Sequence, residues 1–293
     1  MANLVSIGCV CQAPSMMQLR LRTWLVAVLG VAVLSACGGT SATGPDASPT
    51  GGTGVSPEAS PSAQPADPGL ILGADFGDKL GLVLGEGAVI SFQGQAANEV
   101  DTTVMALGGA RLKTVTGSNN HGVGVQFPGK GEGVAAIAAI PRGVDVLSPG
   151  KKRFSFGADF KASGDWGEGS NLVQRGLFTD KSQYKLELDG GRPSCSIKGS
   201  EGEVVVHSSQ SVHAGLWYSV QCARYDEAVV LTLRRLRDSE EWVSLKNGRT
   251  GEVRADTASV PFSVGAKLWP DPGLGKDPDQ FRGVVDNVYL RYE

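Results

Sequence analysis

A succession of short alternating segments between residues 154 and 224 constrains the fold more than any other feature of the chain. In the first segment, 154–160, a phenylalanine or alanine occupies every second position, and serine, glycine or aspartate lies between them. This period of two predicts a half-buried β-strand. Segments of similar length follow, separated by glycine-containing turns, at 183–189, 194–198, 203–207 and 216–224. The spacing predicts an all-β chain in which a meander of strands builds a two-sheet sandwich.

The part of the chain from residue 70 to residue 293 is long enough for one all-β domain with a buried core. Helical periodicity is nearly absent. The apolar run 134–140 lies between Gly133 and Pro141 and is too short for a buried helix. We expect it to be a strand or a loop, and we expect no second folded domain.

Five segments carry a family resemblance through their order and spacing: NLVQRG at 171–176, YKL at 184–186, GRPSCSIKG at 191–199, GLWYSVQC at 215–222 and FRGVVDNVYL at 281–290. Together they resemble a laminin-G-like domain of the concanavalin A-like lectin/glucanase superfamily. The resemblance covers residues 120–293 well and 70–119 loosely. It implies an antiparallel jelly-roll sandwich of two sheets.

The first 36 residues have the organisation of a secretory leader. They contain no acidic residue, carry Arg20 and Arg22, and then run apolar from Trp24 to Leu34. This run is shorter than the roughly 20 residues that a permanent membrane span requires. It is followed by Leu-Ser-Ala-Cys, which resembles a bacterial lipobox and implies lipidation of Cys37 and cleavage before it. A plain secretory peptide with an incidental cysteine is the alternative.

The positive charge of this leader lies far from residue 1, so translation is expected to start at Met16 or Met17. Residues 37–69 are rich in Ser, Thr, Pro, Ala and Gly and contain few large apolar residues. Such a segment cannot bury enough surface to fold. We expect a disordered tether between a lipid anchor in the cell membrane and a domain on its extracytoplasmic face.

The two remaining cysteines, Cys195 and Cys222, lie in the predicted strand region. An extracytoplasmic protein with two cysteines on neighbouring strands is expected to bond them. The family pattern pairs the same two positions. We therefore predict a structural disulfide.

The charge balance argues against nucleic acid as a partner. Removal of the two leader arginines leaves 25 of the 27 basic residues against 30 acidic ones, a net charge of about −5. A basic surface for phosphates is therefore not expected. We also expect a monomer.

Motifs for catalysis are incomplete. Glucanases of the superfamily that the chain resembles place Glu-x-Asp-x-(x)-Glu on one strand, and two carboxylates are needed for glycoside hydrolysis. The nearest match, Glu187-Leu188-Asp189, is followed by Gly-Gly-Arg and lacks the third carboxylate. We expect no enzyme activity, and we interpret both carboxylates as the solvated face of a strand.

Two glycine-rich loops are the candidates for ligand binding. One contains Trp166, and the other contains Trp269 together with Asp271, Asp277 and Asp279. A tryptophan ring can stack on the apolar face of a sugar, and clustered aspartates can bind calcium, an ion that the resemblance implies. The alternative is that both tryptophans pack on the core and that the Asp-Pro pairs shape turns. No other cofactor is expected.

The closing strand changes parity along its length. Phe281 and Val285 share one parity, whereas Val288 and Leu290 share the other. A β-bulge at Asp286-Asn287 would absorb the extra residue. Asp286 either holds this bulge through backbone N–H groups or faces a ligand, and we favour the structural role.

Three classes of function follow, in order of preference. The first is a surface-tethered binding module for a glycan or another extracellular or envelope ligand. The second is a structural or protein-interaction lipoprotein of the envelope. The third is a divergent glycoside hydrolase.

Overall fold

The computed structural model describes residues 67–293, apart from 119, 121, 168, 270–272 and 276. The leader, the start at Met16 or Met17, lipidation at Cys37, nearly all of the tether, and Asp271 therefore lie outside the described residues. The described part of the chain contains no helix with the length and apolarity that crossing a bilayer requires.

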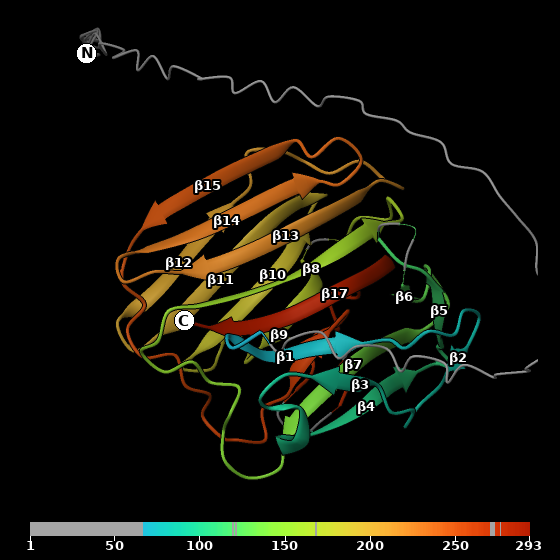
Figure 1. The fold of residues 1–293 in the computed structure, drawn as a ribbon, viewed down its shortest axis with the longest axis horizontal. Coiled ribbons are helices and arrows are strands. Elements are labelled where there is room, and N and C mark those ends of the chain that lie inside the picture. The colour runs from blue at the N-terminus through green and yellow to red at the C-terminus, as the bar shows by residue number, and fades with distance from the viewer. Residues whose placement is uncertain (1–66, 119, 121, 168, 270–272, 276) are drawn as a thin grey trace, which may run out of the picture. The chain divides into compact units, whose positions relative to one another are not determined.

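Two antiparallel sheets pack face to face, with β13–β15 in front of β10–β12 in Figure 1. The seven-stranded sheet runs, in spatial order, through β12 (Gly202–His207), β11 (Arg192–Gly199), β10 (Gln183–Asp189), β9 (Ser170–Arg175), β16 (Phe262–Val264), β7 (Val134–Pro141) and β4 (Val100–Leu107). The prediction of an all-β, two-sheet antiparallel jelly-roll sandwich is confirmed.

The larger sheet has ten strands. Its spatial order is β15 (Glu241–Asn247), β14 (Ala228–Arg235), β13 (Trp217–Arg224), β8 (Phe154–Ala162), β17 (Gly283–Tyr292), β6 (Val123–Gln126), β5 (Leu112–Thr116) and β2 (Val83–Leu84). β1 (Leu70–Asp75) pairs with both β17 and β3 (Ser91–Gln93), and a 3₁₀ turn, Ala97–Glu99, precedes β4. β8 and β17, far apart in the sequence, therefore lie side by side at the centre of this sheet.

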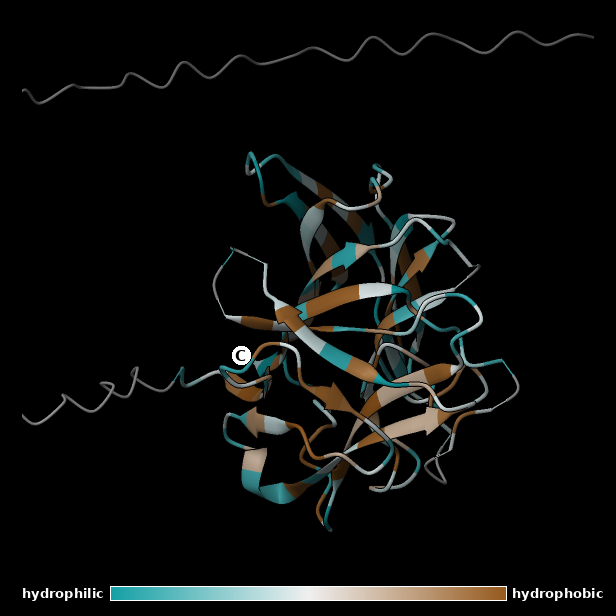
Figure 2. Cartoon of the chain, turned by 90° about the vertical axis from the view of Figure 1, so that its right-hand side faces the viewer, coloured by the Kyte–Doolittle hydropathy of each residue, from teal (hydrophilic) through white to brown (hydrophobic). Residues whose placement is uncertain are grey.

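The core lies between the two sheets and is rich in aromatic side chains. Figure 2 shows that hydrophobic residues lie mainly along the strands. Phe154 and Phe156 of β8 stack at 5.8 Å between ring centroids, and Tyr184 of β10 approaches both rings. Alternation along β8 and β10 thus directs one face of each strand into a shared apolar layer.

The prediction that the strand at 154–160 is half buried was wrong. Both faces of β8 are buried from Phe154 to Phe160. On the outer face, the Tyr289 ring of β17 lies over Gly157, where an added Cβ would come within 2.8 Å of the tyrosine Oη. Asp159 is covered by its hydrogen-bond partners Ser118 and Asn287. The small and polar residues of this face make room for side chains that arrive from other segments.

The apolar run at 134–140 forms β7, and its alanines also face two layers. Ala135, Ile137 and Ala139 belong to the main core. Ala136 and Ala138 point to the other face, where Ala266 and Leu268 cover them in a second apolar cluster. Strand β7 is buried on both sides for this reason, and the segment after β16 is thereby fixed over the outer face of the seven-stranded sheet.

The predicted disulfide between Cys195 and Cys222 is confirmed. The cysteines lie on β11 and β13, their Cα atoms are 6.0 Å apart, and both side chains are fully buried. The expectation that they lie on neighbouring strands was wrong, because β11 and β13 belong to facing sheets. The bond therefore links the two layers through the core.

The predicted bulge in the closing strand is also confirmed. The pairing of β17 with β8 shifts register between Asp286 and Tyr289, and Asn287 has a φ of 47°. Val285, Val288 and Leu290 are all buried despite their different parity. The extra residue at the bulge lets both halves of the strand face the core.

Candidate binding site on the seven-stranded sheet

The two tryptophans singled out from the sequence are both at the surface. Trp166 lies in the connection from β8 to β9 and is 37% exposed, and Trp269 follows β16 and is 45% exposed. Neither belongs to the apolar core clusters. Their rings are nonetheless supported, because an added Cβ at Gly191 would lie 3.1 Å from the Trp166 ring. At Gly275 it would lie 1.9 Å from Nε1 of Trp269.

The described residues on the two sides of 270–272 pair with each other, and we call this pairing the Trp269 hairpin. Leu268 and Leu274 form an antiparallel bridge, and Lys267 N–H donates to the carbonyl of Pro278 at 2.7 Å. Leu268 is buried over β7, whereas Trp269, the next residue, is exposed. Neighbouring residues of an extended segment point to opposite sides, so burial of the leucine turns the tryptophan ring away from β7.

Four charged side chains lie beneath these loops, and we call them the ion-pair cluster: Lys185, Glu187, Lys267 and Asp279. Lys185 pairs with Glu187 on β10, and its Nζ is 3.8 Å from the carboxylate of Asp279. Lys267 Nζ is 2.9 Å from the same carboxylate. All four side chains are between 14% and 19% exposed. The cluster is therefore a partly desolvated polar surface.

The two tryptophan loops meet at this cluster. Gly169 ends the Trp166 loop, and an added Cβ there would lie 3.1 Å from Oε2 of Glu187 and 3.7 Å from Cγ of Asp279. Asn171, at the start of β9, donates its backbone N–H to the carbonyl of Asp279 at 2.8 Å. The chain thus joins the Trp166 loop, the strand β10 and the Trp269 hairpin within one small area.

Asn171 adds a neutral amide to this area. It pairs with Glu187 in the β9–β10 register, and its side chain is fully buried. Neither its Oδ1 nor its Nδ2 has a hydrogen-bond partner among the described residues. Buried amides are normally satisfied, so this group calls for an ordered water as its partner.

The interpretation of Glu187 and Asp189 as one solvated strand face holds only for Asp189, which is exposed. Glu187 is 19% exposed and is ion-paired with Lys185. The hairpin after β16 lies beside this part of the sheet, so Glu187 is only partly solvated.

Asp277 and Asp279, the two described members of the candidate calcium site, both lie beside Lys267. Asp279 is already paired with Lys267, and Asp277 is 87% exposed with its carboxylate 3.9 Å from the same ammonium. A lysine charge beside both carboxylates repels a second cation. Within the ranges that the structure describes, no group of three or more His, Cys, Asp or Glu side chains could hold a metal ion.

Asp286 lies away from this site, on the ten-stranded sheet. Its two oxygens accept the backbone N–H groups of Ser118 and Asn287, each at 2.8 Å. Asp159 opposite accepts the Ser118 hydroxyl and the Asn287 amide. Burial raises the pKa of the Asp286 carboxyl above its ordinary value. In this arrangement both oxygens of Asp286 are engaged in holding the bulge and the 118 turn.

Sequence reasoning found the two tryptophans and Asp279 but missed Lys185, Lys267 and Asn171. The parity of the predicted strand 183–189 places Lys185 on the same face as Glu187, and this signal could have been used. No sequence pattern indicated Lys267 or Asn171. Both come near Glu187 only because the hairpin after β16 lies against β9 and β10.

Known proteins resemble this chain in sequence or in fold. The family model described as the laminin G domain matches residues 171–292. Domain 4 of AbnA, a GH43 extracellular arabinanase from Geobacillus stearothermophilus solved with arabinotriose, aligns with a TM-score of 0.50. The identity is 14%, and the alignment covers 73% of this chain and 94% of that domain. At this identity the likeness shows the fold alone.

More distant matches were also found. The LG1-3 region of the laminin α2 chain aligns with a TM-score of 0.40 at 10% identity, over 80% of this chain and 66% of that one. The binding domain of botulinum neurotoxin serotype D aligns with a TM-score of 0.48 at 11% identity, over 77% and 48%. No curated protein matches the sequence. The described residues thus contain a laminin-G-like domain with a concanavalin-like sandwich.

Proposed function

We propose that this protein is a non-catalytic, glycan-binding module held at the extracytoplasmic face of a cell membrane. The observation that carries the proposal is that two loops, each with a partly exposed tryptophan, meet at the ion-pair cluster. A laminin-G-like domain and a neighbour solved with arabinotriose support a binding role.

The chemistry of the site suits a neutral carbohydrate. An exposed indole ring offers a flat apolar surface for one face of a sugar. The carboxylates of Glu187 and Asp279 accept hydrogen bonds from hydroxyls, and the lysine ammonium groups donate to them. Because the cluster is nearly charge-balanced, it favours a polar, uncharged ligand.

We propose that the site binds glycan without hydrolysing it. A glycosidase needs one carboxylic acid that protonates the leaving group and a second carboxylate that acts as nucleophile or base. Glu187 and Asp279 are the two carboxylates at the cluster, and each is engaged by a lysine ammonium. We therefore propose no general acid at this site.

Glycan-array screening of the purified protein, followed by calorimetry on the best ligand, tests the binding role. Trp269→Ala and Trp166→Ala are each expected to weaken binding at least about tenfold, the size of effect seen when a central aromatic contact is removed. The melting temperature should stay near that of the parent, because neither ring belongs to the core clusters.

Phe178→Ala is the matched control. Phe178 is an aromatic residue that is 73% exposed, in the connection from β9 to β10, and its removal should leave affinity unchanged. Early unfolding of both tryptophan variants would show that the rings stabilise the fold instead of binding ligand. If the protein bound no glycan on the array, the protein-interaction alternative would be favoured.

Membrane anchoring is the second part of the proposal and rests on the lipobox-like sequence before Cys37. Cys37→Ser is expected to release the protein from the membrane fraction or to leave it unprocessed, because acyl chains supply about 0.8 kcal/mol per buried methylene. Fractionation and mass spectrometry of the N-terminus measure this. A processed Cys37→Ser protein that remains in the membrane would rule out the lipid anchor.

A further inference from the structure

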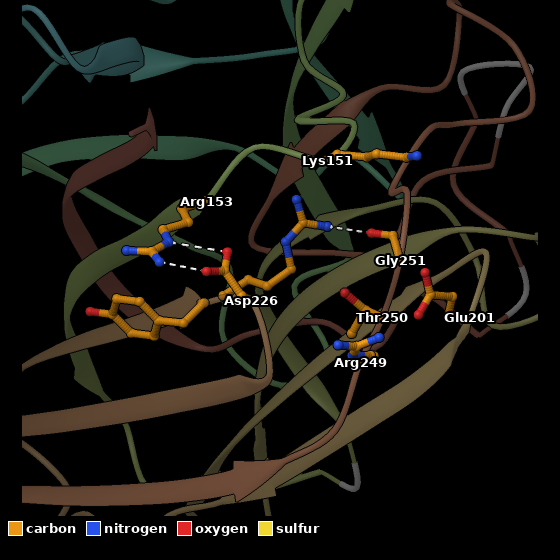
Figure 3. Close-up of a pocket in the computed structure, with 9 residues that line it drawn as sticks. Lys151, Arg153, Glu201, Asp226, Arg249, Thr250 and Gly251 are labelled. Carbon is orange, nitrogen blue, oxygen red and sulfur yellow. Dashed lines mark hydrogen bonds and ion pairs between the residues drawn. The ribbon is translucent and has the colours of Figure 1, made fainter.

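A polar pocket lies near the start of β8, and Figure 3 shows the side chains that line it. Its volume is about 200 Å³, and it is lined by residues that precede β8, by the β13–β14 turn and by the segment 249–251. Trp166 follows the opposite end of β8. Strand β8 has nine residues, so at about 3.3 Å per residue the two sites are roughly 30 Å apart. The pocket is therefore independent of the proposed glycan site.

The charged groups that line the pocket are mostly basic. Four are cationic and two are anionic: Lys151, Arg153, Arg224 and Arg249, against Glu201 and Asp226. Arg153 pairs with Asp226 at 2.5 Å, and Arg249 pairs with Glu227 at 2.6 Å. Lys151 has no ion pair with any described residue. With Glu227 counted, four cations face three carboxylates, so the excess at the pocket is one positive charge, and Glu201 has no ion pair with any described residue.

Arg224 supplies the central charge. It is 5% exposed, and its guanidinium donates to the carbonyls of Gly251 and Gly150 at 2.9 Å each and also to that of Lys152. These three bonds hold the group rigidly, but all three acceptors are neutral. Buried charges are normally paired with an opposite charge. Arg224 has no carboxylate within ion-pair distance in the part of the chain that the structure describes.

Thr250 supplies an unused hydroxyl beside this charge. The residue is 2% exposed and lines the pocket. Its Oγ1 is buried and has no hydrogen-bond partner among the described residues. An unpaired buried hydroxyl is costly, so its retention calls for a partner that is not part of the folded chain.

We propose that this pocket binds an oxyanion, either a phosphate or a carboxylate group that forms part of a larger ligand. Arg224 and Lys151 supply the positive charge, and the Thr250 hydroxyl donates a hydrogen bond to an anion oxygen. Arginine and a hydroxyl are common partners of such groups. The pocket holds roughly seven water volumes, which leaves room for part of the group that carries the anion. The exposed Tyr225 ring lines the same pocket and can pack against that group.

Titration of the full chain with sodium phosphate and with sodium glucuronate, each against sodium chloride at matched ionic strength, tests the proposal. Thermal shift and calorimetry should detect binding that weakens as chloride is added, because salt screens the charges. Thr250→Val should weaken binding about tenfold, as expected for loss of a hydrogen bond to a charged group. Its melting temperature should not fall, because the valine removes an unpaired polar group without changing the side-chain shape.

Lys151→Ala should weaken binding about two- to fivefold, the size expected for one exposed charge. Lys113→Ala is the matched control, since Lys113 is an exposed lysine on β5, far from the pocket in the sheet order. Tighter binding of phosphate would assign a phosphate-bearing ligand, and tighter binding of glucuronate would assign an acidic sugar. The proposal is overturned if neither anion binds better than chloride, or if binding persists unchanged in both pocket variants.

Discussion

Replacement of Arg175 by methionine is expected to lower the free energy of unfolding by about 3 to 5 kcal/mol, the range seen when one partner of a buried ion pair is removed. The Arg175 side chain is 1% exposed, and its Nη2 is 2.8 Å from Oδ1 of Asp145, which is 17% exposed. Without the guanidinium, the aspartate would remain desolvated and unpaired.

Arg175 also joins segments that are distant in the sequence. Its Nε donates to the carbonyl of Val260 at 3.1 Å, and its Nη1 donates to the hydroxyl of Ser148 at 2.8 Å. One side chain on β9 therefore fixes both the connection between β7 and β8 and the segment that leads into β16. Loss of these bonds adds to the destabilisation, because the Val260 carbonyl loses its donor.

Urea denaturation of the variant measures this effect, and the chain offers a matched control. Arg142 and Asp101 form a similar pair at 2.7 Å, but their side chains are 59% and 68% exposed. Arg142→Met should therefore change the stability by no more than about 1 kcal/mol. A double variant, Arg175→Met with Asp145→Leu, should regain part of the loss because no charge is left buried. Equal losses of unfolding free energy in the two arginine variants would show that burial does not make the Arg175 pair more stabilising than the exposed pair.

Removal of the Cys195–Cys222 bond is expected to lower the free energy of unfolding by about 3.5 kcal/mol. The bond closes a loop with a sequence separation of 27 residues, and a loop of this length restricts the unfolded chain by about that amount. For a domain of this size, 1 kcal/mol corresponds to about 2 to 4 °C, so the melting temperature should fall by roughly 7 to 14 °C.

Two preparations separate the cross-link from the packing of the sulfur atoms. Protein refolded under reducing conditions keeps both sulfurs and loses only the bond, whereas the double Cys→Ala variant loses both. Calorimetry should show a large loss in the first and a further, smaller loss in the second, because truncation leaves a cavity in the fully buried site. If the reduced protein had the same melting temperature as the oxidised protein, the bond would contribute nothing to stability.

The sequence was informative where a property depends on near neighbours along the chain. The alternation in 154–160 and 183–189 predicted strands β8 and β10, because side-chain direction repeats every two residues whatever the partner strand is. The parity switch at Asp286 predicted the bulge for the same reason. The disulfide followed from the family pattern and from the presence of only two cysteines outside the N-terminal region.

Properties that depend on which segments cover one another were decided only by the tertiary structure. The alternation within β8 could not show that its outer face is covered by Tyr289, Ser118 and Asn287, because these contacts join residues far apart in the chain. The pairing of Asp279 with lysines, the burial of Arg224 against three carbonyls and the burial of Arg175 have the same origin. The sequence by itself determined the strand type, the pairing of the two cysteines and the candidate loops. The fold alone decided which charges meet and how far water reaches them, since both depend on non-local packing.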